Sequence, residues 1–126
     1  MKYLLTVEAV IEVGTGLLLV ALPSLLTALL LDSSLDTPVA LSVARMFGIA
    51  LLALGVACWL ARHDGQNRAA RGLVIAMVLH NAAIATALVY GGIALGLSGI
   101  GLWPVVLVHV TMAVWCVISL LNKSVQ

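Results

Sequence analysis

Hydrophobic positions along this chain fall into four long runs, separated by short polar or glycine-rich segments. The runs cover about residues 3–22, 38–61, 69–91 and 104–121. A helix needs about 20 consecutive apolar residues to cross the hydrocarbon core of a bilayer. The pattern therefore predicts an all-α fold, a four-helix transmembrane bundle. Because the connections are short, neighbouring helices should be antiparallel and pack as one integral membrane domain over residues 1–126.

A shorter apolar stretch, residues 24–31, lies between the first two runs. Pro23 precedes it, and Asp32 and Asp36 follow it. Proline is favoured at the first position of a helix, so this segment should form a separate short helix. Leu25, Leu26, Leu29 and Leu30 would share one face of it. This amphipathic pattern favours an interfacial helix at the outer membrane surface.

The composition agrees with a membrane protein. Hydrophobic residues make up 63% of the chain, charged residues make up 9%, and the mean hydropathy is +1.23. Soluble domains carry about 25% charged residues. Lys2 and the first run look like a signal peptide, but Glu8 and Glu12 interrupt the run and no A-x-A cleavage site follows, so we interpret it as a retained helix. Nothing in the sequence indicates nucleic-acid binding.

Basic residues set the expected orientation. Outside the helix interiors they occur at the two ends of the chain and in the middle loop, namely at Lys2, Arg62, Arg68, Arg71 and Lys123. The other two connections carry aspartate as their only charged residue. The positive-inside rule therefore predicts both termini in the cytoplasm, as in a multi-pass protein of a bacterial inner membrane.

Six polar residues interrupt the four apolar runs. An ionisable group inside a bilayer costs at least about 2.5–3.5 kcal/mol on insertion scales, so such residues usually face a protein interior or a functional site. Most lie near the midpoint of their helix, whereas Arg45 lies about 7 Å outward of it at 1.5 Å of rise per residue. The set consists of Glu8, Glu12, Arg45, His80, Asn81 and His109.

These residues are expected to meet in one pocket. Glu8 and Glu12 are one turn apart and share a helix face. Arg45 is long enough to reach Glu12 across the axial offset, and this pair would neutralise both charges. Glu8 would then remain unmatched, as a relay on the cytoplasmic side. His109 begins a stripe that continues through Met112, Cys116 and Ser119, whereas Cys58 and Cys116 are interpreted as small apolar filler without metal-ligand spacing.

Several functions remain open for such a pocket. It could bind a small or lipid-like ligand, or exchange a proton with one during transport, since carboxyl and imidazole groups do so near neutral pH. His80 and His109 could instead hold a haem or a metal, with Glu12 or Met112 nearby, although no cofactor is predicted. The groups could also only satisfy one another as interhelical hydrogen bonds. No nucleophile constellation indicates an enzyme.

The segment Ile11-Glu12-Val13-Gly14-Thr15-Gly16 resembles the first-helix motif of the small multidrug resistance transporters, which are also four-helix proteins. In that family the carboxylate exchanges protons for cationic drugs, and the resemblance implies this role for Glu12. It covers the first helix only. Arg45 and the two membrane histidines depart from the family pattern.

The layout of the whole chain is more similar to the DoxX-like group of small bacterial four-helix membrane proteins. The resemblance lies in the proline-terminated first helix, in Ala44-Arg45-Met46-Phe47-Gly48 and in Ala57-Cys58-Trp59-Leu60-Ala61-Arg62. Some DoxX-type proteins accompany membrane redox complexes, which implies a role as an accessory subunit. A bundle of this size is also expected to form a homo-oligomer or to pack against a partner subunit.

Overall fold

The computed structural model describes residues 1–64 and 67–122, and its regular elements over them are all helices. Its helices are α1 Lys2–Ala21, α2 Pro23–Leu31, α3 Pro38–Ala61, α4 Arg68–Ala94 and α5 Leu102–Leu121. The predicted all-α fold of four long helices and one short helix is confirmed. The middle loop's Gly65 and Gln66, and Lys123 near the C-terminus, lie outside the described residues.

Proline and capping side chains set most helix boundaries. Pro23 has no backbone N–H for the α1 ladder, so α1 ends at Ala21 and Pro23 begins α2. Thr37 caps α3 by accepting a hydrogen bond from the Ala40 amide at 3.1 Å. Asn67 caps α4 in the same way through the Ala70 amide, at 2.8 Å.

Helix α4 is three residues longer at its C-terminal end than the sequence pattern predicts. Gly91 and Gly92 were expected to end it, but the helix continues through both to Ala94. The helix terminates just before Gly96, whose φ of +69° lies in the left-handed region. A glycine in this conformation just after a helix is a common way to terminate it.

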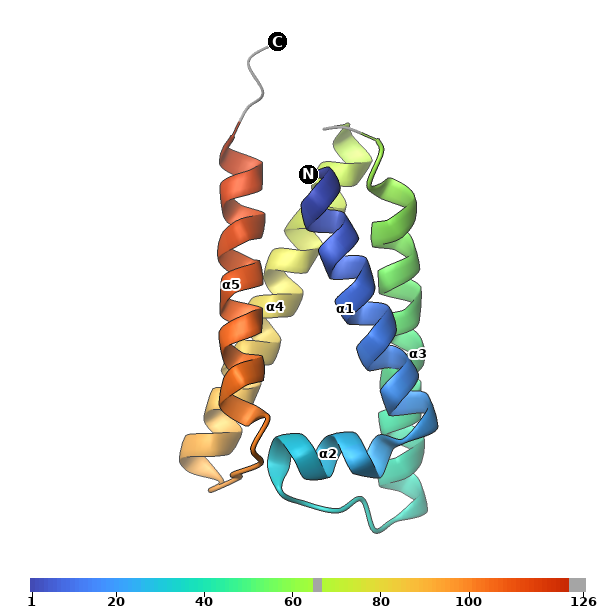
Figure 1. Cartoon of the computed structure of the whole chain (residues 1–126), viewed down its shortest axis with the longest axis vertical. Helices are drawn as coiled ribbons and strands as arrows, with labels where there is room; N and C mark the ends of the chain where they lie inside the picture. The colour runs from blue at the N-terminus through green and yellow to red at the C-terminus, as the bar shows by residue number, and fades with distance from the viewer. Residues whose placement is uncertain (65–66, 123–126) are drawn as a thin grey trace.

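The long helices pack as two pairs. Helix α1 runs along α3 and α4 runs along α5, whereas contacts between the pairs are sparse. The pairs converge at the end that holds the N-terminus and diverge towards the other end, where α2 lies across the space between them (Figure 1). The bundle therefore has a closed half, near the N-terminus, and an open half, near α2.

Glycines bring α1 and α3 into close contact within the open half. A Cβ atom at Gly48 would lie 2.8 Å from the Gly16 carbonyl oxygen, and one at Gly16 would lie 2.7 Å from the Gly48 carbonyl oxygen. Both positions therefore need glycine, as in other membrane helix pairs that pack through small residues. Gly55 makes a similar approach to Val13, where a Cβ would come within 2.7 Å of Cγ2.

The closed half contains the hydrophobic core. All four long helices contribute to it, and its buried apolar members are Leu4, Leu5, Ala9, Cys58, Val74, Met77, Met112 and Cys116. Cys58 and Cys116 are both fully buried within it.

Helix α2 is attached to the loop that precedes α5. The Leu29 carbonyl accepts a hydrogen bond from the Gly101 amide at 2.8 Å. A Cβ atom at Gly99 would overlap the backbone of Leu29 and Leu30, so the loop approaches α2 as closely as glycine permits. This contact ties α2 to the α4–α5 pair and closes the wide end of the bundle.

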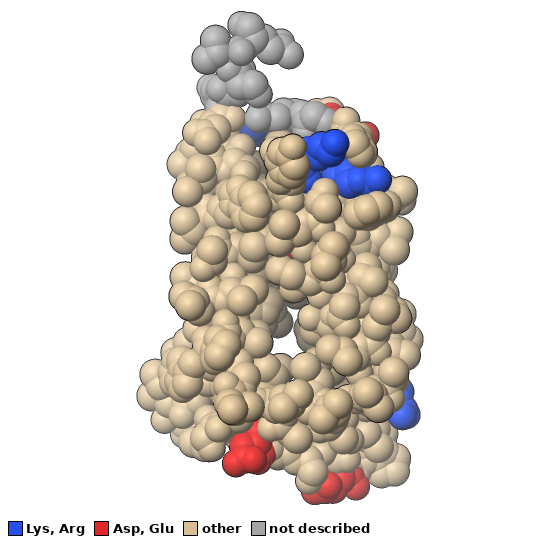
Figure 2. Space-filling view, viewed as in Figure 1, with Lys and Arg blue, Asp and Glu red and all other residues tan. Residues whose placement is uncertain are grey.

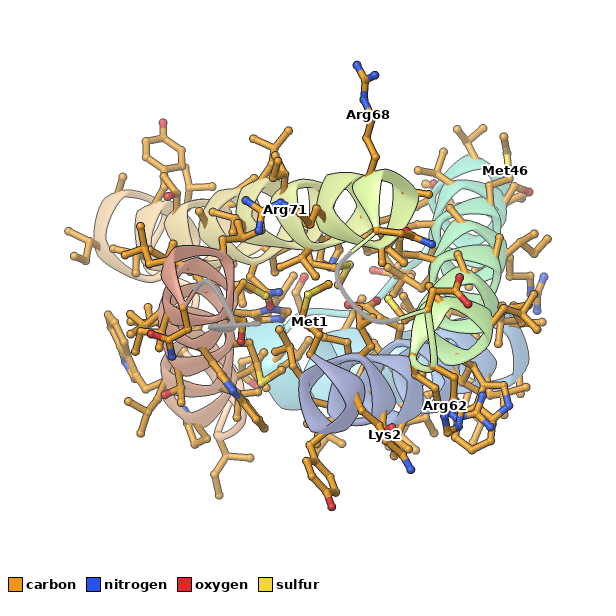
Figure 3. All side chains as sticks on the ribbon, turned by 90° about the horizontal axis from the view of Figure 1, so that it is seen from above. Met1, Lys2, Met46, Arg62, Arg68 and Arg71 are labelled. Carbon is orange, nitrogen blue, oxygen red and sulfur yellow. The ribbon has the colours of Figure 1, made fainter. Side chains whose placement is uncertain are left out.

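The chain is a multi-pass membrane protein by the length and hydropathy of its helices. Helices α1, α3, α4 and α5 are each long and apolar enough to cross a bilayer. Lys2 begins α1, Arg62 follows α3, Arg68 begins α4 and Arg71 lies in the first turn of α4. These basic residues therefore lie at the end that holds the N-terminus (Figure 1), the end from which Figure 3 views the bundle. Lysine and arginine gather at this end of the surface, with one further basic side chain lower on one side, whereas acidic side chains occur at both ends and form the larger patches near α2 (Figure 2).

Candidate functional site

A cavity of about 640 Å³ occupies the open half of the bundle, between the two helix pairs and above α2. All five helices contribute to its wall, which is mainly aliphatic. The polar exceptions include Glu12, Thr15, His80 and His109. Ligand pockets in proteins usually enclose about 300–1,000 Å³ and are apolar with a few well-placed polar groups. The cavity matches this description.

Glu12 and His80 form a pair on the cavity wall. His80 Nε2 lies 3.1 Å from Glu12 Oε1, and the side chains are 16% and 3% exposed respectively. Their helices α1 and α4 belong to different pairs, so this contact joins the two halves of the wall. A carboxylate accepts from imidazole, which can also carry a positive charge. The pair therefore places an exchangeable proton beside the cavity.

Glu8 lies one turn away from Glu12, within the closed half. Its Oε1 accepts a hydrogen bond from Asn81 Nδ2 at 3.0 Å and one from the Cys116 thiol at 3.4 Å. Its Oε2 is the one buried side-chain nitrogen or oxygen atom without a hydrogen-bond partner in residues 1–64 and 67–122. Glu8 therefore ties α1 to both α4 and α5, in a region without water access.

Asn81 lies between Glu8 in the closed half and His109 on the cavity wall, and it hydrogen-bonds to both. Its Nδ2 also donates to the Met77 carbonyl at 3.0 Å, and its Oδ1 lies 2.8 Å from His109 Nδ1. A carbonyl oxygen only accepts, so the contact with Met77 fixes which end of the amide is nitrogen. Asn81 Oδ1 is then the acceptor, and His109 Nδ1 carries the proton. The chain Glu8–Asn81–His109 connects the closed core with the cavity wall.

The two histidines meet at the cavity. Their rings are arranged edge to face with centroids 6.0 Å apart. The structure thus brings together Glu8, Glu12, His80, Asn81 and His109, which come from α1, α4 and α5. Of these residues, Glu12, His80 and His109 line the cavity, whereas Glu8 and Asn81 are buried beside it and are not on its wall. The predicted role of the set in ligand or proton binding stays a prediction.

Arg45 does not join this group, so the predicted contact between Arg45 and Glu12 is wrong. The Arg45 side chain is exposed, and its Nε donates to the Val20 carbonyl at 3.3 Å. Ala44 lines the cavity, and the next residue along a helix points about 100° away from it. Arg45 therefore turns outward and supports the last turn of α1.

Cys116 has a contact that the sequence analysis missed. Its fully buried thiol donates to Glu8 Oε1, so it is more than apolar filler. The available signal was the stripe that it shares with His109, seven residues earlier on α5. Met112 belongs to the same stripe but packs within the hydrophobic core.

No group of three or more His, Cys, Asp or Glu side chains is placed to hold a metal ion in the described part of the chain. One nitrogen of each histidine already has a protein partner: His80 Nε2 faces Glu12 and His109 Nδ1 faces Asn81. A haem or metal held by His80 and His109, with Met112 or Glu12 nearby, stays a prediction from the sequence.

No family model, curated protein or solved structure matches the chain in the three comparisons. The resemblances to the DoxX-like group and to the small multidrug resistance transporters therefore stay predictions.

Proposed function

We propose that this membrane protein binds a small, lipid-soluble molecule in the cavity between its two helix pairs. The observation that carries the proposal is the cavity itself, about 640 Å³ of mainly apolar space with Glu12, His80 and His109 on its wall. A bundle built only for stability would fill this space with side chains, because protein interiors are close-packed. Placing ionisable groups on the wall also carries an insertion cost, which a binding site would explain.

The polar groups favour binding with a defined orientation. Aliphatic walls hold an apolar body, and the few polar groups position its head. Glu12 and His80 could in addition exchange a proton with the surroundings as the ligand binds, which is the step that proton-coupled transport would need. Binding is the function proposed here, and transport would be an extension of it.

We place the converging end of the bundle in the cytoplasm. Lys2, Arg62, Arg68 and Arg71 lie at this end, and the positive-inside rule assigns such an end to the cytoplasmic side. The cavity then lies in the outward half of the membrane, with α2 towards the outer surface.

The test fills the cavity with a side chain. Ala44 lines the cavity on α3, whereas Ala50 on the same helix is exposed and lies outside the wall. Native mass spectrometry of protein released from detergent should show a small molecule bound to the wild type and to Ala50→Phe, but not to Ala44→Phe. Fragmentation of the bound species would identify it. An equal load on all three proteins, or none on the wild type, would contradict the proposal.

A further inference from the structure

The polar end of the cavity offers mainly hydrogen-bond acceptors. His109 Nδ1 carries a proton for Asn81 Oδ1, so a neutral His109 keeps its Nε2 as a lone-pair acceptor. The structure gives Nε2 no partner within residues 1–64 and 67–122. Glu12 accepts from His80 through Oε1 and retains the lone pairs of its second oxygen. A ligand head that only accepts hydrogen bonds would leave these atoms unpaired.

Thr15 adds a hydroxyl to the same end of the cavity. In membrane helices threonine usually donates to the carbonyl four residues earlier, as Thr6, Thr86 and Thr111 do here. No such bond is formed by Thr15, which lies on the wall one turn beyond Glu12. Its hydroxyl is therefore available both to donate to a ligand and to accept from it. A head group that both donates and accepts would use this end of the cavity fully.

The charge of the wall favours a neutral head. Glu12 carries the one carboxyl on the wall, and no lysine or arginine lines the cavity within the described residues. The Glu12–His80 pair has zero net charge as carboxylate with imidazolium or as carboxylic acid with imidazole. Carboxylate with neutral imidazole would leave one negative charge, and tighter binding of a cationic head would reveal that state. An ammonium head would add an uncompensated charge inside a low-dielectric site, where unpaired charges are costly. An ammonium group also accepts no hydrogen bond from Thr15.

The cavity is open to the side of the bundle. Figure 2 shows a gap through the molecule between the α5 side and the α1–α3 side, above α2. It lies at the depth of the apolar helix surfaces, between the basic and the acidic ends. A molecule dissolved in the bilayer can therefore reach the cavity without crossing water.

We infer that the ligand is a neutral amphiphile with a hydroxyl head, an aliphatic or ring alcohol, which enters from the bilayer. Its hydroxyl donates to His109 Nε2 or Glu12 and accepts from Thr15, and its apolar body lies against the aliphatic wall and α2. This inference rests on the proposed binding function and specifies its ligand class.

Three probes with the same apolar body separate the alternatives. Radiolabelled 1-dodecanol, dodecyl methyl ether and dodecylamine would be titrated against the wild type in phosphatidylcholine nanodiscs, with protein-free discs as the partition control. We expect saturable binding of 1-dodecanol at one molecule per chain. The ether keeps the acceptor but lacks the donor, and the amine is cationic at neutral pH. The ether should bind about tenfold more weakly, since one hydrogen bond to a buried acceptor is worth about that factor. The amine should also bind more weakly, because its charge would be uncompensated in the cavity.

The outcomes distinguish this inference from the proposed function. If the ether binds as tightly as the alcohol, or the amine binds more tightly, the hydroxyl assignment is wrong and the binding function stands. If no probe binds above protein-free discs, the binding function fails as well. Either His109→Phe or Glu12→Leu, whichever removes the acceptor, should lower the affinity for 1-dodecanol about tenfold and leave the affinity for the ether unchanged. An unchanged 1-dodecanol affinity in both variants would contradict the hydroxyl assignment. The wild-type probe series remains decisive even if these variants fold poorly.

Discussion

The closed and open halves of the bundle are built from the same four helices, yet they use polar residues differently. In the closed half Glu8 is buried in a core of leucine, methionine and cysteine side chains, with Asn81 and Cys116 as partners. In the open half Glu12, one turn further along α1, lies on a cavity wall beside His80. Identical side chains on one helix face thus have different surroundings, because the two helix pairs diverge between them.

The two glutamates therefore have different roles: Glu8 stabilises the bundle, whereas Glu12 faces the cavity. Glu8 joins α1 to α4 and α5 through short hydrogen bonds in a dry environment, where leaving a partner unpaired is expensive. Glu12 keeps an oxygen for the cavity. We therefore assign Glu8 chiefly to holding the pairs together and Glu12 to the ligand. Asn81 connects Glu8 with the cavity wall, because its amide nitrogen donates to Glu8 and its amide oxygen accepts from His109.

The largest effect should come from Glu8→Leu. This change leaves the Asn81 amide and the Cys116 thiol with a lost partner in the core, and we expect a loss of about 3 kcal/mol in unfolding free energy. Glu12→Leu should cost about 1 kcal/mol or less, since His80 borders the cavity and interhelical hydrogen bonds in membranes are individually weak. Thermal or denaturant unfolding in detergent would measure both. Glu8→Gln, which retains an acceptor for Asn81, is the matched control. Equal losses for the two leucine variants would remove the proposed distinction.

In the open half α1 stays packed against α3 although the two helix pairs diverge, and the Gly16–Gly48 contact accounts for this. Gly48→Ala places a Cβ 2.8 Å from the Gly16 carbonyl oxygen and 2.8 Å from Leu19 Cβ, so α1 and α3 must separate. We expect a loss of about 2 kcal/mol, typical of an overpacked contact. Gly14 is the matched control, because a Cβ there meets nothing within 4 Å. Gly14→Ala should leave stability unchanged or raise it slightly, by less than about 1 kcal/mol. If both substitutions behave alike, close packing of α1 on α3 is not what keeps this pair together.

The smallest effect is expected for Arg45→Ala. Arg45 lies outside the cavity and contacts the C-terminal turn of α1 through the Val20 carbonyl. A cation at a helix C-terminus contributes about 0.3–1 kcal/mol, so a loss near 0.5 kcal/mol is expected. Affinity for 1-dodecanol should not change. A loss of ligand affinity would show that Arg45 acts on the site after all, as the sequence analysis expected.

The sequence by itself determined the helices and the polar set. Long apolar runs, Pro23 and the capping residues Thr37 and Asn67 fix the helix positions through local physics, namely backbone hydrogen bonding and the thickness of a bilayer. The cost of burying polar and ionisable groups identified Glu8, Glu12, His80, Asn81 and His109 as residues that meet. The same argument pointed to Arg45, which lies outside the group.

Which of these side chains contact one another, in contrast, was decided by the tertiary structure. Periodicity gives the face of each helix only approximately, and a rotation of 100° per residue separates Ala44 on the cavity wall from Arg45 outside it. Glycine contacts such as Gly16 with Gly48 fix the packing within the α1–α3 pair, and no single apolar run reveals the angle at which the two pairs diverge. Because that angle opens a cavity beside Glu12 and keeps Glu8 in the core, only the assembled bundle distinguishes the two carboxyls.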